Sequence, residues 1–157
     1  MRHIICIIAL FTQFLGNAQN KEEYTKIIED IKKTKEYEGF ISSHKQNCKG
    51  LAVSKYKYSI CSFGSFFKDG EIKSFLDSKC SEEETFKSKK CNLLKKLSDK
   101  GNTCFIADFS FKIKDKIGVK IISKKDEGKI GYESLHFLYD ISTNEVRMLE
   151  AIKVTND

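Results

Sequence analysis

The fold is decided by one stretch, Thr103-Cys104-Phe105-Ile106-Ala107-Asp108-Phe109-Ser110-Phe111-Lys112-Ile113, in which apolar side chains recur at every second position. A period of two is that of a β-strand with one face against a hydrophobic core. Three more strand-like segments follow, at 117–122, 129–139 and 145–154, and short turn-like sequences connect them. Because short links between successive strands favour antiparallel neighbours, residues 103–154 predict a four-stranded meander.

Residues 21–63 are predicted to form a helix, a loop and a strand. The helix, over 21–37, follows from an apolar stripe at i, i+3, i+4 and i+7: Tyr24, Ile27, Ile28 and Ile31. Gly39 is expected to end this helix, since glycine is common just after a helix C-terminus, and residues 40–50 are expected to form a loop. Alternation over 51–63 then predicts a strand with Tyr56, Tyr58 and Ile60 on one face.

Two further helices are predicted between this strand and the meander. A short one spans 71–78, and a long one runs from the capping box Ser81-Glu82-Glu83-Glu84 to Gly101. Five lysines gather along the long helix: Lys87, Lys89, Lys90, Lys95 and Lys96. The negative C-terminal end of a helix attracts lysines, and solvation accommodates the others, so no ligand is needed to explain them. A ligand site is the alternative.

The order helix, strand, two helices and four strands predicts an α+β domain. Its helices are expected to pack on one face of a curved antiparallel sheet that ends in the four-stranded meander. Cystatin-like and NTF2-like domains share this general order. The likeness is an analogy of architecture only, because no motif of either family occurs, and it carries no function.

The first eighteen residues have the pattern of a secretory signal peptide. A short basic start, Met1-Arg2-His3, precedes an apolar run over 4–11, and the small residues Gly16 and Ala18 suit cleavage after Ala18. The run is too short to span a bilayer, which takes about 20 apolar residues. We therefore expect residues 19–157 to form a single secreted domain, extracellular or periplasmic.

Charge and composition argue against nucleic acid as a partner. The predicted mature chain carries 27 basic and 22 acidic residues, and Arg147 is its only arginine. Nucleic-acid sites favour arginine for its planar, bidentate guanidinium, and the lysines here alternate with acidic residues along the chain. The charge pattern therefore indicates a solvated surface. No later segment is long and apolar enough to predict a membrane span.

Five cysteines remain after the predicted cleavage: Cys48, Cys61, Cys80, Cys91 and Cys104. In an exported chain they are expected to oxidise to two disulfides and one free thiol, and the sequence does not choose among the pairings. The unpaired cysteine could be buried or could join two copies in a disulfide-linked dimer. No Cys-x-x-Cys pair occurs, so neither a metal site nor a thiol-redox site is expected.

The sequence lacks the common catalytic and phosphate-binding motifs, and no cofactor is expected. His44 is expected to be exposed in a polar loop. His136 lies mid-strand and is expected to face solvent on the open side of the sheet, away from its neighbours Leu135 and Phe137. Asp108 is an acid on a strand whose other face is aromatic, and it is a candidate neighbour of His136 on an adjacent strand.

Glu150 falls on the apolar face of the last strand, which is formed by Val146, Met148, Ile152 and Val154. A carboxylate in a core is costly unless it is paired, protonated or beside a wet cavity. One interpretation is a helix–sheet pocket with Glu150 as general base or hydrogen-bond acceptor, lined by Tyr56, Tyr58, Phe109 and Phe137. The alternatives are a β-bulge, or a core face made instead by Leu149 and Ala151.

Three functions are compatible with these patterns. The leading hypothesis is a small secreted, disulfide-stabilised binding protein, whose partner is a protein or a small apolar ligand. The second is a small acid/base enzyme, with Glu150, His136 and Asp108 as its catalytic candidates. The third is assembly of two chains through the unpaired cysteine.

Overall fold

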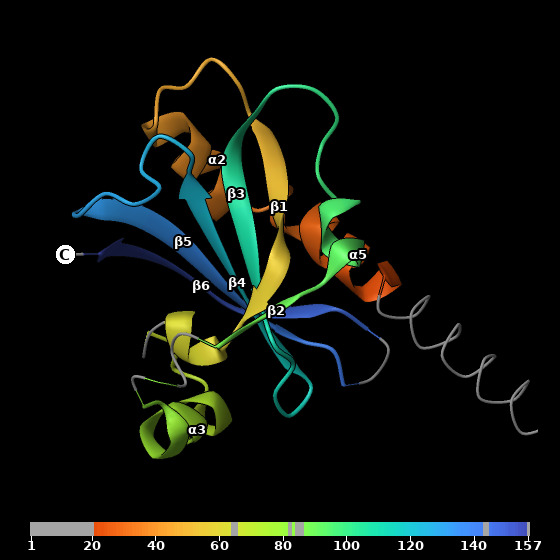
Figure 1. The fold of residues 1–157 in the computed structure, drawn as a ribbon, viewed down its shortest axis with the longest axis vertical. Coiled ribbons are helices and arrows are strands. Elements are labelled where there is room, and N and C mark those ends of the chain that lie inside the picture. Colours follow the sequence, from red (N-terminus) through yellow and green to blue (C-terminus); the bar gives the residue numbers. More distant parts are fainter. Residues whose placement is uncertain (1–20, 64–65, 82, 84–86, 143–144, 157) are drawn as a thin grey trace, which may run out of the picture.

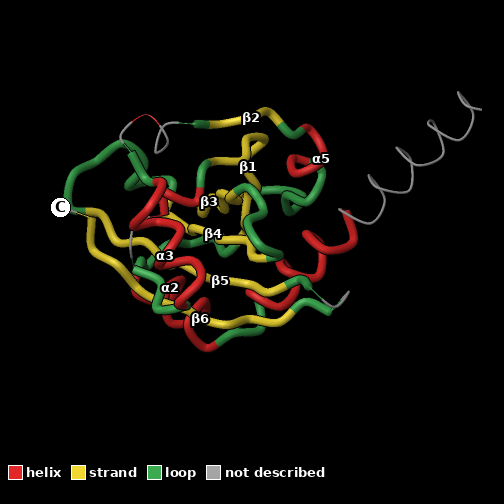
Figure 2. Tube along the Cα trace, turned by 90° about the horizontal axis from the view of Figure 1, so that it is seen from below, coloured by secondary structure: helices red, strands yellow, loops and turns green. Residues whose placement is uncertain are grey.

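The computed structural model describes residues 21–63, 66–81, 83, 87–142 and 145–156. The predicted signal peptide, 1–18, and two residues of the predicted capping box, Glu82 and Glu84, lie outside these residues. The predicted α+β class is confirmed, and its centre is a six-stranded sheet of order β2-β1-β3-β4-β5-β6 (Figures 1 and 2). The strands are β1 Gly50–Tyr58, β2 Ser88–Lys90, β3 Thr103–Ser110, β4 Lys116–Ser123, β5 Tyr132–Asp140 and β6 Arg147–Asn156.

The meander is formed as the period-two pattern predicts. Strands β3, β4, β5 and β6 pair antiparallel with their neighbours in sequence order. Strand β1 lies parallel to β3, and the short strand β2 pairs antiparallel with β1 at one edge of the sheet.

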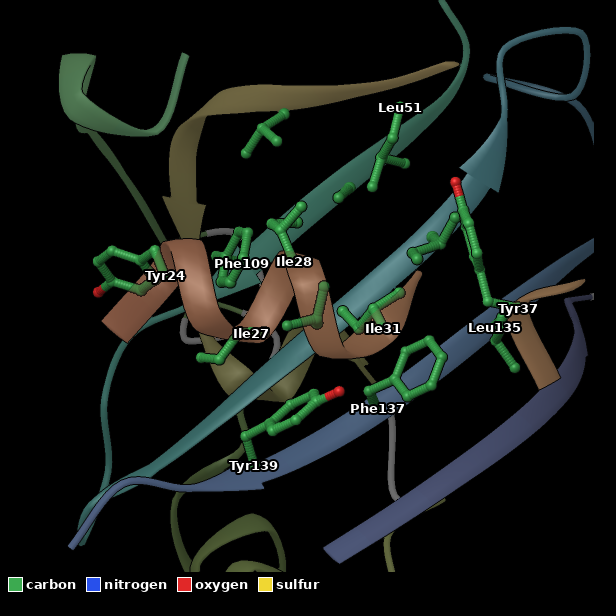
Figure 3. Packing of buried hydrophobic residues seen from close by; sticks show 14 of the residues in the cluster. Tyr24, Ile27, Ile28, Ile31, Tyr37, Leu51, Phe109, Leu135, Phe137 and Tyr139 are labelled. Atoms are coloured by element: carbon green, nitrogen blue, oxygen red, sulfur yellow. The ribbon is translucent and has the colours of Figure 1, made fainter. Parts of the chain in front are cut away.

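One face of the sheet, here called the inner face, carries the main core. The helix over 21–31 crosses it, and its predicted stripe of Tyr24, Ile27, Ile28 and Ile31 is buried there, as Figure 3 shows. Helix α2, Lys35–Ser43, and helix α5, Asn92–Lys95, add Phe40 and Leu94 to the same core. Tyr139 also belongs to this core, and its hydroxyl donates a 2.8 Å hydrogen bond to Asp30.

A second, smaller layer covers part of the opposite, outer face. The 3-10 helix η1, Ile60–Phe63, and helix α3, Gly70–Lys79, pack there around Leu138. Leu138 points away from Phe137 and Tyr139, which belong to the inner core, because successive strand residues alternate in direction. The expectation that helices lie on one face therefore holds for 21–31, α2 and α5, while η1 and α3 occupy the other face.

The predicted boundaries of the first helix and the first strand are wrong. The helix ends at Ile31, and α2 begins after Thr34, whose hydroxyl oxygen accepts a 3.1 Å hydrogen bond from the Tyr37 N–H. This N-cap restarts a helix that runs through Gly39 to Ser43, so the loop expected over 40–50 is shorter. Strand β1 ends at Tyr58, ahead of η1, and buries Leu51 and Val53 rather than its tyrosines.

Over the described residues 87–101, the prediction of a long helix is also wrong. Its place is taken by strand β2 and the single-turn helix α5. The N–H of Cys91 donates a 2.6 Å hydrogen bond to the Lys55 carbonyl, and Lys89 pairs with Lys57, so this segment extends along β1. Tertiary pairing with β1 therefore overrides the local helical pattern. The short helix predicted over 71–78 is confirmed as α3.

The five cysteines of the described residues form two disulfides and leave one free thiol, as their odd number predicts. Cys48 is bonded to Cys104, Cys61 is bonded to Cys80, and Cys91 is free and half-buried. The first bridge joins the segment before β1 to β3, and the second joins η1 to the end of α3.

Of the helices in the described part of the chain, none has the length and hydrophobicity needed to cross a membrane.

Candidate functional site

Three polar side chains form a row across the outer face of the sheet. Asp108 on β3 is directly opposite Lys120 on β4, and Lys120 is directly opposite His136 on β5. Because neighbouring strands lie about 4.8 Å apart, the row spans about 10 Å. Asp108 and His136 are therefore two strands apart, with Lys120 between them, and not on adjacent strands as the sequence suggested. We call Asp108, Lys120 and His136 the polar row.

His136 is buried rather than facing solvent, which contradicts the expectation from the sequence. Only 1% of the residue is exposed, and the rings of Phe63, Phe66 and Phe67 surround it at centroid distances of 5.4–6.4 Å. Its Nε2 atom lies 2.8 Å from the hydroxyl of Ser134, while Nδ1 has no hydrogen-bond partner among the described residues. A buried polar atom without a partner is uncommon in folded proteins, and the backbone of Phe63 lies close enough to this ring to act on it.

The surroundings of the polar row change the pKa values of both its ends. Burial and the positive charge of Lys120 together lower the pKa of His136 to about 4, while a hydrogen bond to the backbone of Phe63 partly opposes the change. Burial raises the pKa of Asp108, against the opposing effects of Lys120 and a hydrogen bond from Ser54. At neutral pH the imidazole of His136 is therefore neutral.

The polar row lies at the margin of the layer formed by η1 and α3. Next to the row, Gly118 sits directly under Phe63 and Phe67, which would be 3.5–3.6 Å from an added Cβ atom. The ammonium group of Lys120 lies 6.0 Å from the centre of the Phe63 ring. Asp108 and Lys120 are half-buried, whereas His136 is enclosed. His136, at one end of the row, is therefore covered, whereas Lys120 and Asp108 are partly accessible.

The residues predicted to line a helix–sheet pocket do not meet. Phe109 and Phe137 are buried in the inner core, whereas Tyr58 packs against the outer cluster. Tyr56 is 37% exposed near the edge of the sheet, where it pairs with Lys90. These four side chains are therefore divided between the two faces and the edge of the sheet.

Glu150 lies on the outer face with Ile152, while Ala151 between them packs against the inner core, as in one alternative drawn from the sequence. A β-bulge, the other alternative, separates Glu150 from Met148. The pairing with β5 shifts between Leu138–Glu150 and Tyr139–Met148, so Glu150 and Met148 point to opposite faces. Both carboxylate oxygens of Glu150 accept hydrogen bonds from the N–H of Lys68, at 3.0 and 2.7 Å. The geometry gives Glu150 an anchoring contact to the segment between η1 and α3.

His44 also has a packed environment instead of the expected exposed one. It lies at the end of α2 between Phe40 and Phe105, with Nδ1 2.8 Å from the Phe40 carbonyl and Nε2 3.5 Å from Asp126. All of these partners are structural. In the described part of the chain, no group of three or more His, Cys, Asp or Glu side chains could hold a metal ion.

The comparisons add no family to this description. The chain matches no protein-family model, no curated protein and no solved structure. Only the arrangement of its own residues bears on the function.

Proposed function

We propose that the chain is an exported, disulfide-stabilised binding protein, and that its ligand contacts the polar row on the outer face of the sheet. The N-terminal pattern of residues 1–18 supports export. Two disulfides in a chain of this size support it as well, since disulfides persist in oxidising compartments.

The polar row is the observation that carries the proposal. Asp108 and Lys120 lie on a partly covered sheet face. Ile106 and Ile122 are the next residues of that face on the same two strands, and Ser54 is a hydrogen-bond partner of Asp108. Burying such charges even partly costs free energy, and a stable core does not need charged residues at these positions. Perturbed pKa values at a partly accessible cluster are typical of binding and catalytic sites.

The chemistry of the row indicates a ligand with hydroxyl groups beside an apolar surface. Asp108 accepts hydrogen bonds, and Lys120 donates them about one strand spacing away. Phe66, whose ring is 5.4 Å from that of His136, is 39% exposed and offers an aromatic surface beside the row. A saccharide ring combines hydroxyl groups on its edge with C–H groups on its faces, so we propose a saccharide as the ligand.

The proposal is tested by saturation-transfer NMR with N-acetylglucosamine, glucose and galactose as probes. We expect saturation transfer to at least one sugar in the wild type and its loss in Asp108→Val and Lys120→Met. Lys26→Met is the control, because Lys26 lies in the helix on the inner side and its side chain is about half exposed. No transfer to any probe, or equal transfer in all variants, would contradict the proposal.

A further inference from the structure

A pocket of about 320 Å³ lies away from the polar row. Residues of the helix over 21–31, of β1 and of the β2–α5 segment line it, and Figure 1 shows these elements close together at one edge of the sheet. The residues that line the pocket are Tyr24, Lys57, Lys89, Lys90, Cys91, Leu93 and Phe111. This volume is at the lower end of the range for small-molecule sites.

Two lysines of this pocket are placed directly opposite each other. Lys57 on β1 pairs with Lys89 on β2, so their side chains leave the sheet on the same side. Like charges directly opposite in an antiparallel pair are destabilising. The sequence predicted Lys89 on a solvated helix, whereas the structure places it in strand β2, directly opposite Lys57.

Lys57 is held in this position and cannot easily turn away. It is half-buried, and its ammonium group donates a hydrogen bond to the Tyr24 hydroxyl and lies 4.4 Å from the centre of the Tyr24 ring. Burial lowers the pKa of Lys57, and Lys89 contributes to the lowering, while Cys91 and Glu23 oppose it. Glu23 is the carboxylate that acts on Lys57, yet it is not among the described residues that line the pocket.

We propose that this pocket binds a small organic anion. Its acidic group would lie between the ammonium groups of Lys57 and Lys89, where it removes the repulsion between them. Its apolar part would contact Leu93, Phe111 and the ring of Tyr24. Lysine suits this role because its ammonium group is a compact charge with three donors, which does not demand the planar geometry that arginine favours.

The test uses 4-phenylbutyrate as the probe and 4-phenyl-1-butanol, its uncharged counterpart, as the control ligand. Isothermal titration calorimetry of the disulfide-intact protein should show at least about tenfold weaker binding of the alcohol, the size expected for losing one charge-assisted hydrogen bond. Lys89→Gln should weaken phenylbutyrate binding by a similar factor. Lys73→Gln should not, because Lys73 is an exposed residue of α3 on the other face.

Cys91 provides a second measurement at the same pocket. Alkylation of this free thiol by iodoacetamide, followed by peptide mass spectrometry, should slow when phenylbutyrate is present and should be unaffected in Lys89→Gln at the same concentration. Equal affinity for the acid and the alcohol, equal affinity of Lys89→Gln and Lys73→Gln, or no binding and no protection would each overturn the proposal. Since Lys89 is exposed on an edge strand, Lys89→Gln is expected to fold normally.

Discussion

His136 is buried in its neutral form, and this makes the stability of the fold depend on pH. The pKa of His136 is about 4 in the folded state, against 6.5 for an ordinary histidine, which is its value in the unfolded chain. Between these values the unfolded chain binds the proton and the folded chain does not. The contribution of His136 is therefore complete above pH 6.5 and is lost as the pH falls towards 4, by about 3 kcal/mol in total.

Urea unfolding between pH 7.5 and 4 measures this dependence. The free energy of unfolding of the wild type should fall with pH in this window, and His136→Asn should be less stable at pH 7.5 but lose less on acidification. The difference between the two curves isolates the contribution of His136 from that of the carboxylates, which titrate over the same pH range. Parallel curves for the two proteins would show that His136 is not the group responsible.

The polar row was only partly predictable from sequence. The alternation of β3 and β5 correctly places Asp108 and His136 opposite to the aromatic core face, because that pattern is local. The position of Lys120 between them depends on the register of β4, which a turn sequence alone does not fix. The burial of His136 depends on Phe63, which is 73 positions earlier in the chain and has no sequence pattern linking it to β5.

Two disulfides connect elements of the fold and should differ in their effect on stability. Cys48–Cys104 closes a separation of 56 residues, whereas Cys61–Cys80 closes one of 19. In the chain-entropy model, the longer loop contributes about 4 kcal/mol and the shorter one about 3 kcal/mol. We expect Cys48→Ser with Cys104→Ser to lower the free energy of unfolding more than Cys61→Ser with Cys80→Ser.

Chemical unfolding of the two double variants gives the comparison directly. The free Cys91 serves as the control, because Cys91→Ser removes a thiol without opening a loop and should change stability far less than either pair. A larger loss for the Cys61–Cys80 pair would show that its contact between η1 and α3 matters more than loop closure.

The sequence predicted the helices and strands that follow from a local pattern. It did not predict those that depend on pairing with a segment far away in the chain. The four strands of the meander follow from their own alternation and short connections. The segment over 81–101 has a helical arrangement of leucines, yet only Leu94 of Leu93, Leu94 and Leu97 is fully buried. Its conversion to β2 depends on hydrogen bonds to β1, more than thirty residues away. The Lys57–Lys89 pair could not be predicted either, because it also depends on the pairing of β2 with β1.

Across the whole molecule, the two faces of the sheet have different roles. The inner face is closed by the helix over 21–31 and by α2, and its side chains form a continuous apolar core, as Figures 1 and 3 show. Polar groups are instead concentrated at the margin of the outer layer and at the β1–β2 edge. The two proposed sites therefore use different surfaces, and a variant in one can serve as a control for the other.

The proposal that the chain is exported and cleaved after Ala18 is tested by intact mass spectrometry of protein recovered from the medium of cells that produce it. We expect a chain that starts at Gln19, with two disulfides and one thiol that alkylates without reduction. We also expect a monomer. Cys91 is half-buried beside Lys57, Lys89 and Lys90, and a second copy would bring an identical positive cluster against the first. A mass that retains Met1, a chain with no disulfide, or a dimer that dissociates on reduction would contradict the corresponding part of this prediction.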